Sequence, residues 1–188
     1  MSKRDARIRL NTHIAFTNPP TPGLHSCALI WDLRDPPFTA AQLVPSYPAY
    51  PRTSTAHKPH TALPSEFATT PPVRTLSVTC GLFPPGGAWR IAAHNPRGAT
   101  VADVLRAVHG ALHVPLTQAE WRAMAGKQRA RVARAYDERW RGAADPARER
   151  MQGVRRIDAL LGCTRFGGLI MSYEREGECV LSLTRNTM

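Results

Sequence analysis

The stretch that decides the fold runs from Trp89 to Trp140 and reads WRIAAHNPRGATVADVLRAVHGALHVPLTQAEWRAMAGKQRARVARAYDERW. Its first residues alternate, with Trp89, Ile91 and Ala93 on one side, which predicts a β-strand. A turn at 95–98 follows, and then two or three helices. The rest of the chain is expected to supply strands that form a sheet beneath these helices.

Two capping patterns mark where the helices begin. Thr100 and Asp103 form the first, and Thr117 and Glu120 repeat it, so each threonine is expected to accept a hydrogen bond at a helix start. Gly126 is expected to break or kink the second helix, which resumes to about residue 141. The apolar residues of the first helix recur with helical spacing and predict a single buried stripe: Val101, Val104, Leu105, Val108 and Leu112.

Alternating apolar residues predict strands on both sides of this helical stretch. Residues 75–80 pair with 89–93 across a Pro-Pro-Gly-Gly loop, and 169–173 pair with 178–184 in a last hairpin. Residues 28–33 form a further strand, and 154–161 favour a short helix. The order of strands, helices and strands predicts an α+β domain, with a mostly antiparallel sheet of about five strands and two or three helices packed on one face.

The length of 188 residues is typical of a single domain. We expect a flexible N-terminal segment over 1–25 and one α+β domain over 26–186. Within the domain, residues 38–72 are rich in Pro, Ser and Thr and lack apolar periodicity, which predicts a long surface loop.

Composition limits the classes of function. No apolar run is long enough to span a membrane, and the charged N-terminus lacks the apolar core of a secretory signal. No cysteines are spaced as a C-x-x-C pair, so they are expected to be reduced thiols of a cytoplasmic or nuclear protein: Cys27, Cys80, Cys163 and Cys179.

The net charge of +11 is large for this length. Lysine occurs only at Lys3, Lys58 and Lys127, so arginine supplies nearly all the positive charge. A genomic preference for arginine codons explains the type of cation, but it does not explain the excess of cations over acids. Such an excess attracts nucleic acids and other polyanions.

Several short pieces of the sequence, taken together, resemble a fungal domain of unknown function, numbered 6699 in its series and found chiefly in mushroom-forming basidiomycetes. Order and spacing agree over roughly residues 28–184. The resemblance implies a fungal origin and a shared fold, and it assigns no catalytic residues. The pieces are WDLRDPP at 31–37, ATTPP at 68–72, TVADVL at 100–105, TQAEW at 117–121, Ala135-Tyr136 with Arg139, GVRRIDAL at 153–160 and FGGL at 166–169.

Few residues suggest chemistry. His109 and His113 have metal-ligand spacing, but Gly110 stands where zincins carry glutamate, so ordinary boundary histidines are expected. His94 and Arg97 precede a helix start and would suit an anion there, unless the capping side chains already occupy its amides. Cys163 beside Arg165 is a third candidate. We predict no metal, no cofactor and no catalytic set, although a small enzyme using His94 or Cys163 remains an alternative.

Four cations on one helix face form the best candidate binding surface: Lys127, Arg131, Arg134 and Arg141. The aromatic residues nearby, Trp121, Tyr136 and Trp140, are expected on the core side. Arg156 with Asp158 is expected to form a structural ion pair. The leading hypothesis is a non-enzymatic module that binds a protein partner. The alternative is nucleic-acid or polyanion binding through this arginine-rich face. No membrane association is expected.

Overall fold

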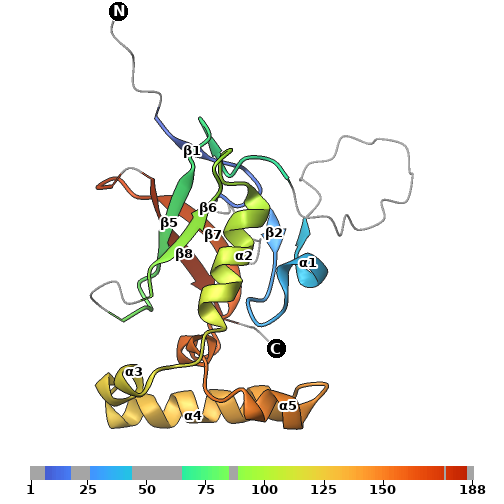
Figure 1. Ribbon diagram of the computed structural model, residues 1–188, viewed down its shortest axis with the longest axis vertical. Helices are drawn as coiled ribbons and strands as arrows, with labels where there is room; N and C mark the ends of the chain where they lie inside the picture. The colour runs from blue at the N-terminus through green and yellow to red at the C-terminus, as the bar shows by residue number, and fades with distance from the viewer. Residues whose placement is uncertain (1–6, 18–25, 44–64, 85–88, 176, 186–188) are drawn as a thin grey trace, which may run out of the picture.

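A four-stranded sheet forms the centre of the protein (Figure 1). The structure is a computed structural model that describes residues 7–17, 26–43, 65–84, 89–175 and 177–185. Strands β5 and β6 pair antiparallel, as do β7 and β8, whereas β5 and β8 are parallel neighbours. The sheet order is β6-β5-β8-β7, with strands Thr75–Thr79 (β5), Ile91–His94 (β6), Arg165–Met171 (β7) and Glu178–Thr184 (β8).

Helix α2 (Val101–Leu112) lies across one face of this sheet (Figure 1). Its apolar stripe is fully buried, because α2 packs against β6 and Val101, Val104, Leu105 and Val108 belong to the same hydrophobic core as the inward residues of the sheet. The capping box predicted at Thr100 is present, with both the Thr100 side chain and the Asp103 side chain bonded to backbone amides. These amides are therefore already occupied.

The outer edge of β7 is covered by two earlier parts of the chain. The amide of Leu169 donates to Ile14, and the amide of Phe166 donates to the carbonyl of Trp31. Both Ile14 and Trp31 are buried, so these segments extend the core as well as the sheet. Short pieces of structure support them: β1 (Arg9–Leu10) pairs with β4 (Thr69–Thr70), and β2 (Leu29–Ile30) pairs with β3 (Gln42–Leu43), which follows α1 (Pro37–Ala40).

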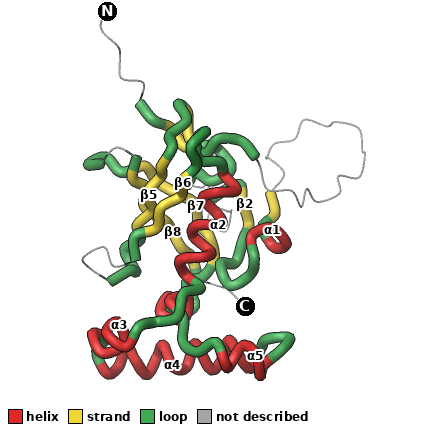
Figure 2. The backbone as a smooth tube through the Cα atoms, viewed as in Figure 1, coloured by secondary structure: helices red, strands yellow, loops and turns green. Residues whose placement is uncertain are grey.

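Three further helices form a separate unit at one end of the sheet, which we call the helical layer (Figures 1 and 2). They are α3 (Gln118–Ala123), α4 (Gly126–Arg141) and α5 (Pro146–Met151). A 3-10 helix, η1 (Arg156–Leu160), lies between α4 and the rest of the domain and returns the chain to β7. Over 118–151, only Met124 and Val132 are buried apolar residues.

The predicted α+β class is confirmed, and the details differ in three places. The break or kink expected at Gly126 is a break that comes just before it, because Met124 and Ala125 are extended and end α3, and Gly126 then begins α4. After residue 141 the chain forms a further helix that the sequence analysis did not predict, α5, which Asp145 caps. Among the described helices, α2 is the one that covers the sheet face, since α3–α5 turn away from it. Residues 1–6 and 18–25 of the expected N-terminal segment, 44–64 of the expected surface loop and 85–88 around the expected hairpin loop lie outside the described residues.

Gly168 allows the N-terminal segment to lie close against β7. Gly168 follows a bulge in β7 and has φ of +106°, a conformation that other residues rarely adopt. A Cβ atom at Gly168 would lie 2.8 Å from the backbone nitrogen and Cα of Phe16. Gly168 is therefore required by the backbone conformation and by the close approach together.

Replacing Gly168 with alanine is expected to destabilise the protein by more than the about 1–3 kcal/mol that backbone strain alone costs, because the segment at Phe16 must also move. Urea unfolding followed by circular dichroism measures the change. Gly162→Ala is the matched control, since Gly162 has φ of +84° but no atom near its Cβ position. Equal losses in the two variants would show that the contact with Phe16 has no energetic weight.

Candidate functional site

The four cations expected on one face of the second helix do share a face of α4. Lys127, Arg131, Arg134 and Arg141 follow the spacing i, i+4, i+7 and i+14, and all four are exposed. At 1.5 Å per residue they extend over about 21 Å of the helix. We call this set the basic stripe. Val132 and Arg139 point the opposite way, since both have little exposed surface.

Most of the charge of the basic stripe is not neutralised. Within the described residues, no carboxylate lies within 4.0 Å of Lys127, Arg131 or Arg134. Arg141 alone has an acidic partner, with 3.9 Å between Arg141 Nη2 and Asp137 Oδ2. Like charges three or four residues apart on a helix repel each other, by about 0.2–0.5 kcal/mol for each pair. The stripe therefore destabilises α4 locally.

The start of α4 is also unfavourable. Ala125 stands at the N-cap and no side chain caps the helix, whereas α2, α3 and α5 each have a capping side chain. No acid occurs in the first turn of α4, where Lys127 lies close to the positive end of the helix dipole. Local interactions do not account for α4, so its stability depends on contacts made by its inward face.

Those contacts are polar and surround Arg139. The Arg139 guanidinium binds Asp158 through Nε at 2.7 Å and Nη2 at 2.9 Å, donates to the carbonyl of Gly153 and forms an ion pair with Glu149. Glu149 also pairs with Arg155 at 3.0 Å. The set connects α4, α5 and η1, and we call it the polar cluster: Arg139, Glu149, Arg155, Asp158 and His113.

His113, just after α2, links the polar cluster to the sheet half of the protein. Its Nδ1 lies 3.1 Å from Arg155 Nη1, and its Nε2 lies 3.0 Å from the carbonyl oxygen of Leu33. Because a guanidinium only donates, Nδ1 must accept, and Nε2 must carry the proton that it donates to Leu33. His113 is therefore neutral, and burial together with Arg155 lowers its pKa.

His109 stacks on His113 with 3.9 Å between the ring centroids. Burial and the neighbouring His113 and Arg155 lower the pKa of His109 to about 4. Both nitrogens of His113 are occupied, so His113 has no free lone pair to offer a metal, whereas the buried Nε2 of His109 has no hydrogen-bond partner. Across the part of the chain that the structure describes, no group of three or more His, Cys, Asp or Glu residues could hold a metal ion.

A second link joins α3 to the sheet half. Glu120 accepts hydrogen bonds from the indole nitrogen of Trp89 and from Arg156 Nη2, while the Arg156 guanidinium lies over the Trp89 ring. The expected pair of Arg156 with Asp158 is wrong, because Asp158 faces Arg139 and the amide of Arg155 instead. Adjacent residues on a 3-10 turn point in different directions, which separates Arg156 from Arg155 and Asp158.

The other predicted binding residues lie away from the basic stripe. His94 ends β6 and Arg97 belongs to the turn before α2, and both are exposed. Helix α2 leads from this turn toward the helical layer, so its 12 residues separate the two groups by about 18 Å (Figure 1). His94 Nδ1 is hydrogen bonded to the hydroxyl of Thr75 at 2.9 Å. The structure does not bring His94 and Arg97 together with the stripe.

The aromatic residues of the helical layer are less buried than expected, since Trp121, Tyr136 and Trp140 are all half-exposed. The guanidinium carbons of Arg141 and Arg150 lie 5.1 and 5.2 Å from the Trp140 ring centroid. Sequence reasoning missed Arg148 and Arg150 because it did not recognise α5. Asp145 followed by Pro146 is the N-cap and first-turn pattern that predicts such a helix.

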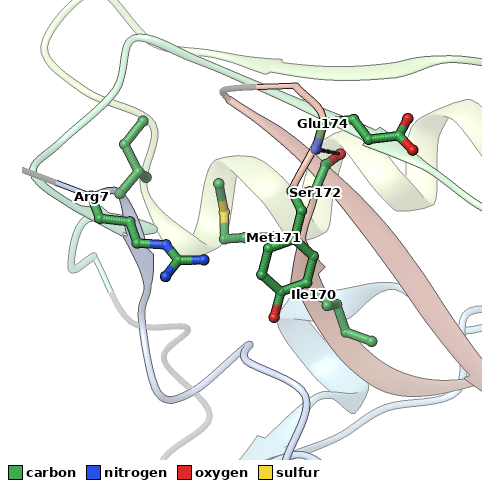
Figure 3. A pocket seen from close by; sticks show the side chains of 7 residues that line it. Arg7, Ile170, Met171, Ser172 and Glu174 are labelled. Carbon is green, nitrogen blue, oxygen red and sulfur yellow. Dashed lines mark hydrogen bonds between the residues drawn. The ribbon is translucent and has the colours of Figure 1, made fainter. Parts of the chain in front are cut away.

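The hollows on the described surface include two that bear on the predicted sites. One, of about 330 Å³, lies where Arg7 faces Met171 and the residues after β7 (Figure 3). Its Arg7 guanidinium lies 5.5 Å from the Tyr173 ring centroid, and Tyr173 is almost fully exposed. The other, of about 400 Å³, lies between the start of α3 and Val154, beside Trp121. Neither hollow contains His94 or Cys163, the residues considered for catalysis.

Replacing Arg139 with methionine is expected to destabilise the protein by about 3–5 kcal/mol, because Asp158 would be left buried without its partner. Arg134→Met on the same helix is the matched control and is expected to change stability by about 0.5 kcal/mol or less. Urea unfolding at pH 7 compares the two variants. Similar losses in both would mean that the polar cluster does not hold α4.

In the described residues, no helix is both long enough and apolar enough to cross a membrane. Neither a curated protein nor a solved structure shows significant similarity to the chain. Residues 29–179 match the model of a family of unknown function, DUF6699, and the chain belongs to that family.

Proposed function

We propose that this protein is a non-enzymatic interaction module that binds the phosphate backbone of a nucleic acid through the basic stripe. The observation that carries the proposal is the state of Lys127, Arg131 and Arg134. They are exposed, share one helix face and have no carboxylate within 4.0 Å among the described residues. Cations kept unpaired despite mutual repulsion suit a ligand that brings the opposite charge.

The composition of the stripe favours a polyanion over a folded protein partner. Tight protein interfaces depend on a few large side chains that become buried at their centre. The exposed face of α4 offers no large apolar residue, since Val132 is buried and Tyr136 and Trp140 lie to the side. A nucleic acid needs no such anchor, because the release of condensed counterions supplies the binding free energy.

The geometry favours contacts to the backbone over contacts to bases. Single-strand binders usually add aromatic platforms on which bases stack, and none lies within the basic stripe. Two exposed cations of α5, Arg148 and Arg150, enlarge the positive surface beyond Arg141. Binding of this kind has little sequence preference and depends strongly on salt.

The expectation of a protein partner remains the second candidate. An acidic, unfolded protein segment would also satisfy the charge of the stripe, and it would dissociate at moderate salt because exposed ion pairs contribute little. We place the protein in the cytoplasm or nucleus of a fungal, basidiomycete cell, on the basis of the resemblance and the spacing of its cysteines. No part of the proposal requires catalysis, a metal or a cofactor.

The protein is expected to bind a labelled DNA or RNA duplex with an affinity that falls steeply as salt rises. Fluorescence anisotropy at several salt concentrations gives the slope of log affinity against log salt. The triple variant Lys127→Gln, Arg131→Gln and Arg134→Gln should lower that slope by about 0.9 for each phosphate contact that it removes. This variant removes three positive charges, and a comparison variant with three other substitutions removes the same number.

The comparison variant is Arg9→Gln, Arg74→Gln and Arg97→Gln, which removes three exposed arginines of the sheet half. It should leave the slope nearly unchanged. Equal effects of both variants would mean that net charge alone governs binding and would overturn the assignment to the stripe. Binding to polyglutamate but not to any nucleic acid would favour the protein partner instead.

A further inference from the structure

The helical layer is joined to the sheet half mainly through polar groups. Its connections are the polar cluster, the Glu120 link and the two chain segments that enter and leave it, 113–117 and 152–156. The entering segment pairs with the leaving one through a hydrogen bond from the amide of Leu116 to the carbonyl of Val154. Over 118–151 only Met124 and Val132 are buried apolar residues, so the protonation state of the polar groups that attach the layer has unusual weight.

His113 occupies the one position in the polar cluster that requires a neutral group. Its Nδ1 accepts a hydrogen bond from Arg155, and this bond is impossible once Nδ1 carries a proton. Protonation would therefore remove the bond and place a second positive charge about 3.1 Å from the Arg155 guanidinium. Arg155 cannot retreat without also losing its contact with Glu149.

We propose that His113 is an acid-sensitive latch whose protonation releases the helical layer from the sheet half while the sheet remains folded. His113 contacts Arg155, Arg155 contacts Glu149, and Glu149 contacts Arg139. Loss of the first contact therefore weakens the second and then the third. The inference concerns the attachment of the layer, and it holds whether or not the basic stripe binds nucleic acid.

The charged groups around His113 disfavour its protonation while the layer is attached. Arg155 faces His113 from the start of η1, Arg139 faces it from α4, and both disfavour its protonation. Glu149 on α5 favours it, but Arg139 and Arg155 already neutralise that carboxylate. On α2, the neutral His109 ring stacks on His113. In the segment that supplies the Leu33 carbonyl, Asp32 forms an ion pair with Arg34, and Asp35 is exposed.

The effect of pH follows from the sign of the shift. Burial and Arg155 hold the pKa of His113 below its ordinary value of 6.5, so the latched state binds fewer protons than the released state. The attachment is at full strength above pH 6.5 and weakens as the pH falls below it. Since the pKa of His109 is lowered to about 4, His109 stays neutral through the first part of this fall.

Hydrogen exchange measured by mass spectrometry at pH 7.5 and pH 5, corrected for the intrinsic rate of exchange, tests the latch on the wild-type chain. Amides of α4 and α5 should lose protection, by up to about tenfold for each pH unit below 6.5 until the lowered pKa of His113 is reached, while β5 and β8 keep theirs. Equal retention in both parts, or equal loss in both, would overturn the proposal. Titration of the His113 ring by NMR with an unshifted pKa would do the same.

Two variants assign the response to His113. His113→Gln keeps an amide that can donate to the Leu33 carbonyl but cannot be protonated, so its α4 and α5 protection should not change between pH 7.5 and pH 5. His94→Gln, at the end of β6 before α2 begins, should respond as the wild type does. An unchanged response in His113→Gln would reject the latch. If that variant does not fold, the wild-type exchange and NMR results decide.

Discussion

The ion pair between Arg139 and Asp158 is the interaction on which the helical layer depends. It lies almost out of reach of water, with 9% of the Arg139 side chain and 2% of the Asp158 side chain exposed. Removing two charges from water is costly, and the cost is offset only where their hydrogen-bonding capacity is used. Asp158 accepts three hydrogen bonds, two from Arg139 and one from the amide of Arg155. The pair thereby fixes α4 against η1 in one orientation, and the direction of the basic stripe follows from it.

The residues of this ion pair are among those that carry the family resemblance. Of the pieces that carry it, Arg139 and residues 153–160 supply most of the polar cluster, and residues 117–121 supply Glu120 of the second link. Residues 31–37 supply Leu33, whose carbonyl receives His113. None of the basic stripe lies in these pieces. These pieces therefore include much of what attaches the helical layer, together with parts of the sheet half at 68–72, 100–105 and 166–169, and they do not indicate what the layer binds.

The elements that could be predicted from the sequence are those whose deciding interactions are local. The capping boxes at Thr100 and Thr117 are both present, and the alternation over 75–80 and 89–93 became the antiparallel pair of β5 and β6. The four cations of the stripe share a face because helical periodicity alone places them there. What could not be predicted depends on distant partners. Nothing near Arg139 or Asp158 in the sequence indicates that they pair, and the expected partner, Arg156, is turned toward Glu120.

The position of β8 has a consequence for how this chain reaches its folded state. Of the four strands it comes last in the chain, yet it lies between β5 and β7, and Ser77 finds its partner about a hundred positions away at Glu178. Closing so long a loop precedes any gain from the contacts, which makes such topologies slow to fold. During synthesis, β5 and β6 emerge early, and one edge of β5 stays unpaired until β8 has been synthesised. This incomplete hairpin is the species on which chaperones would act and from which aggregation would start.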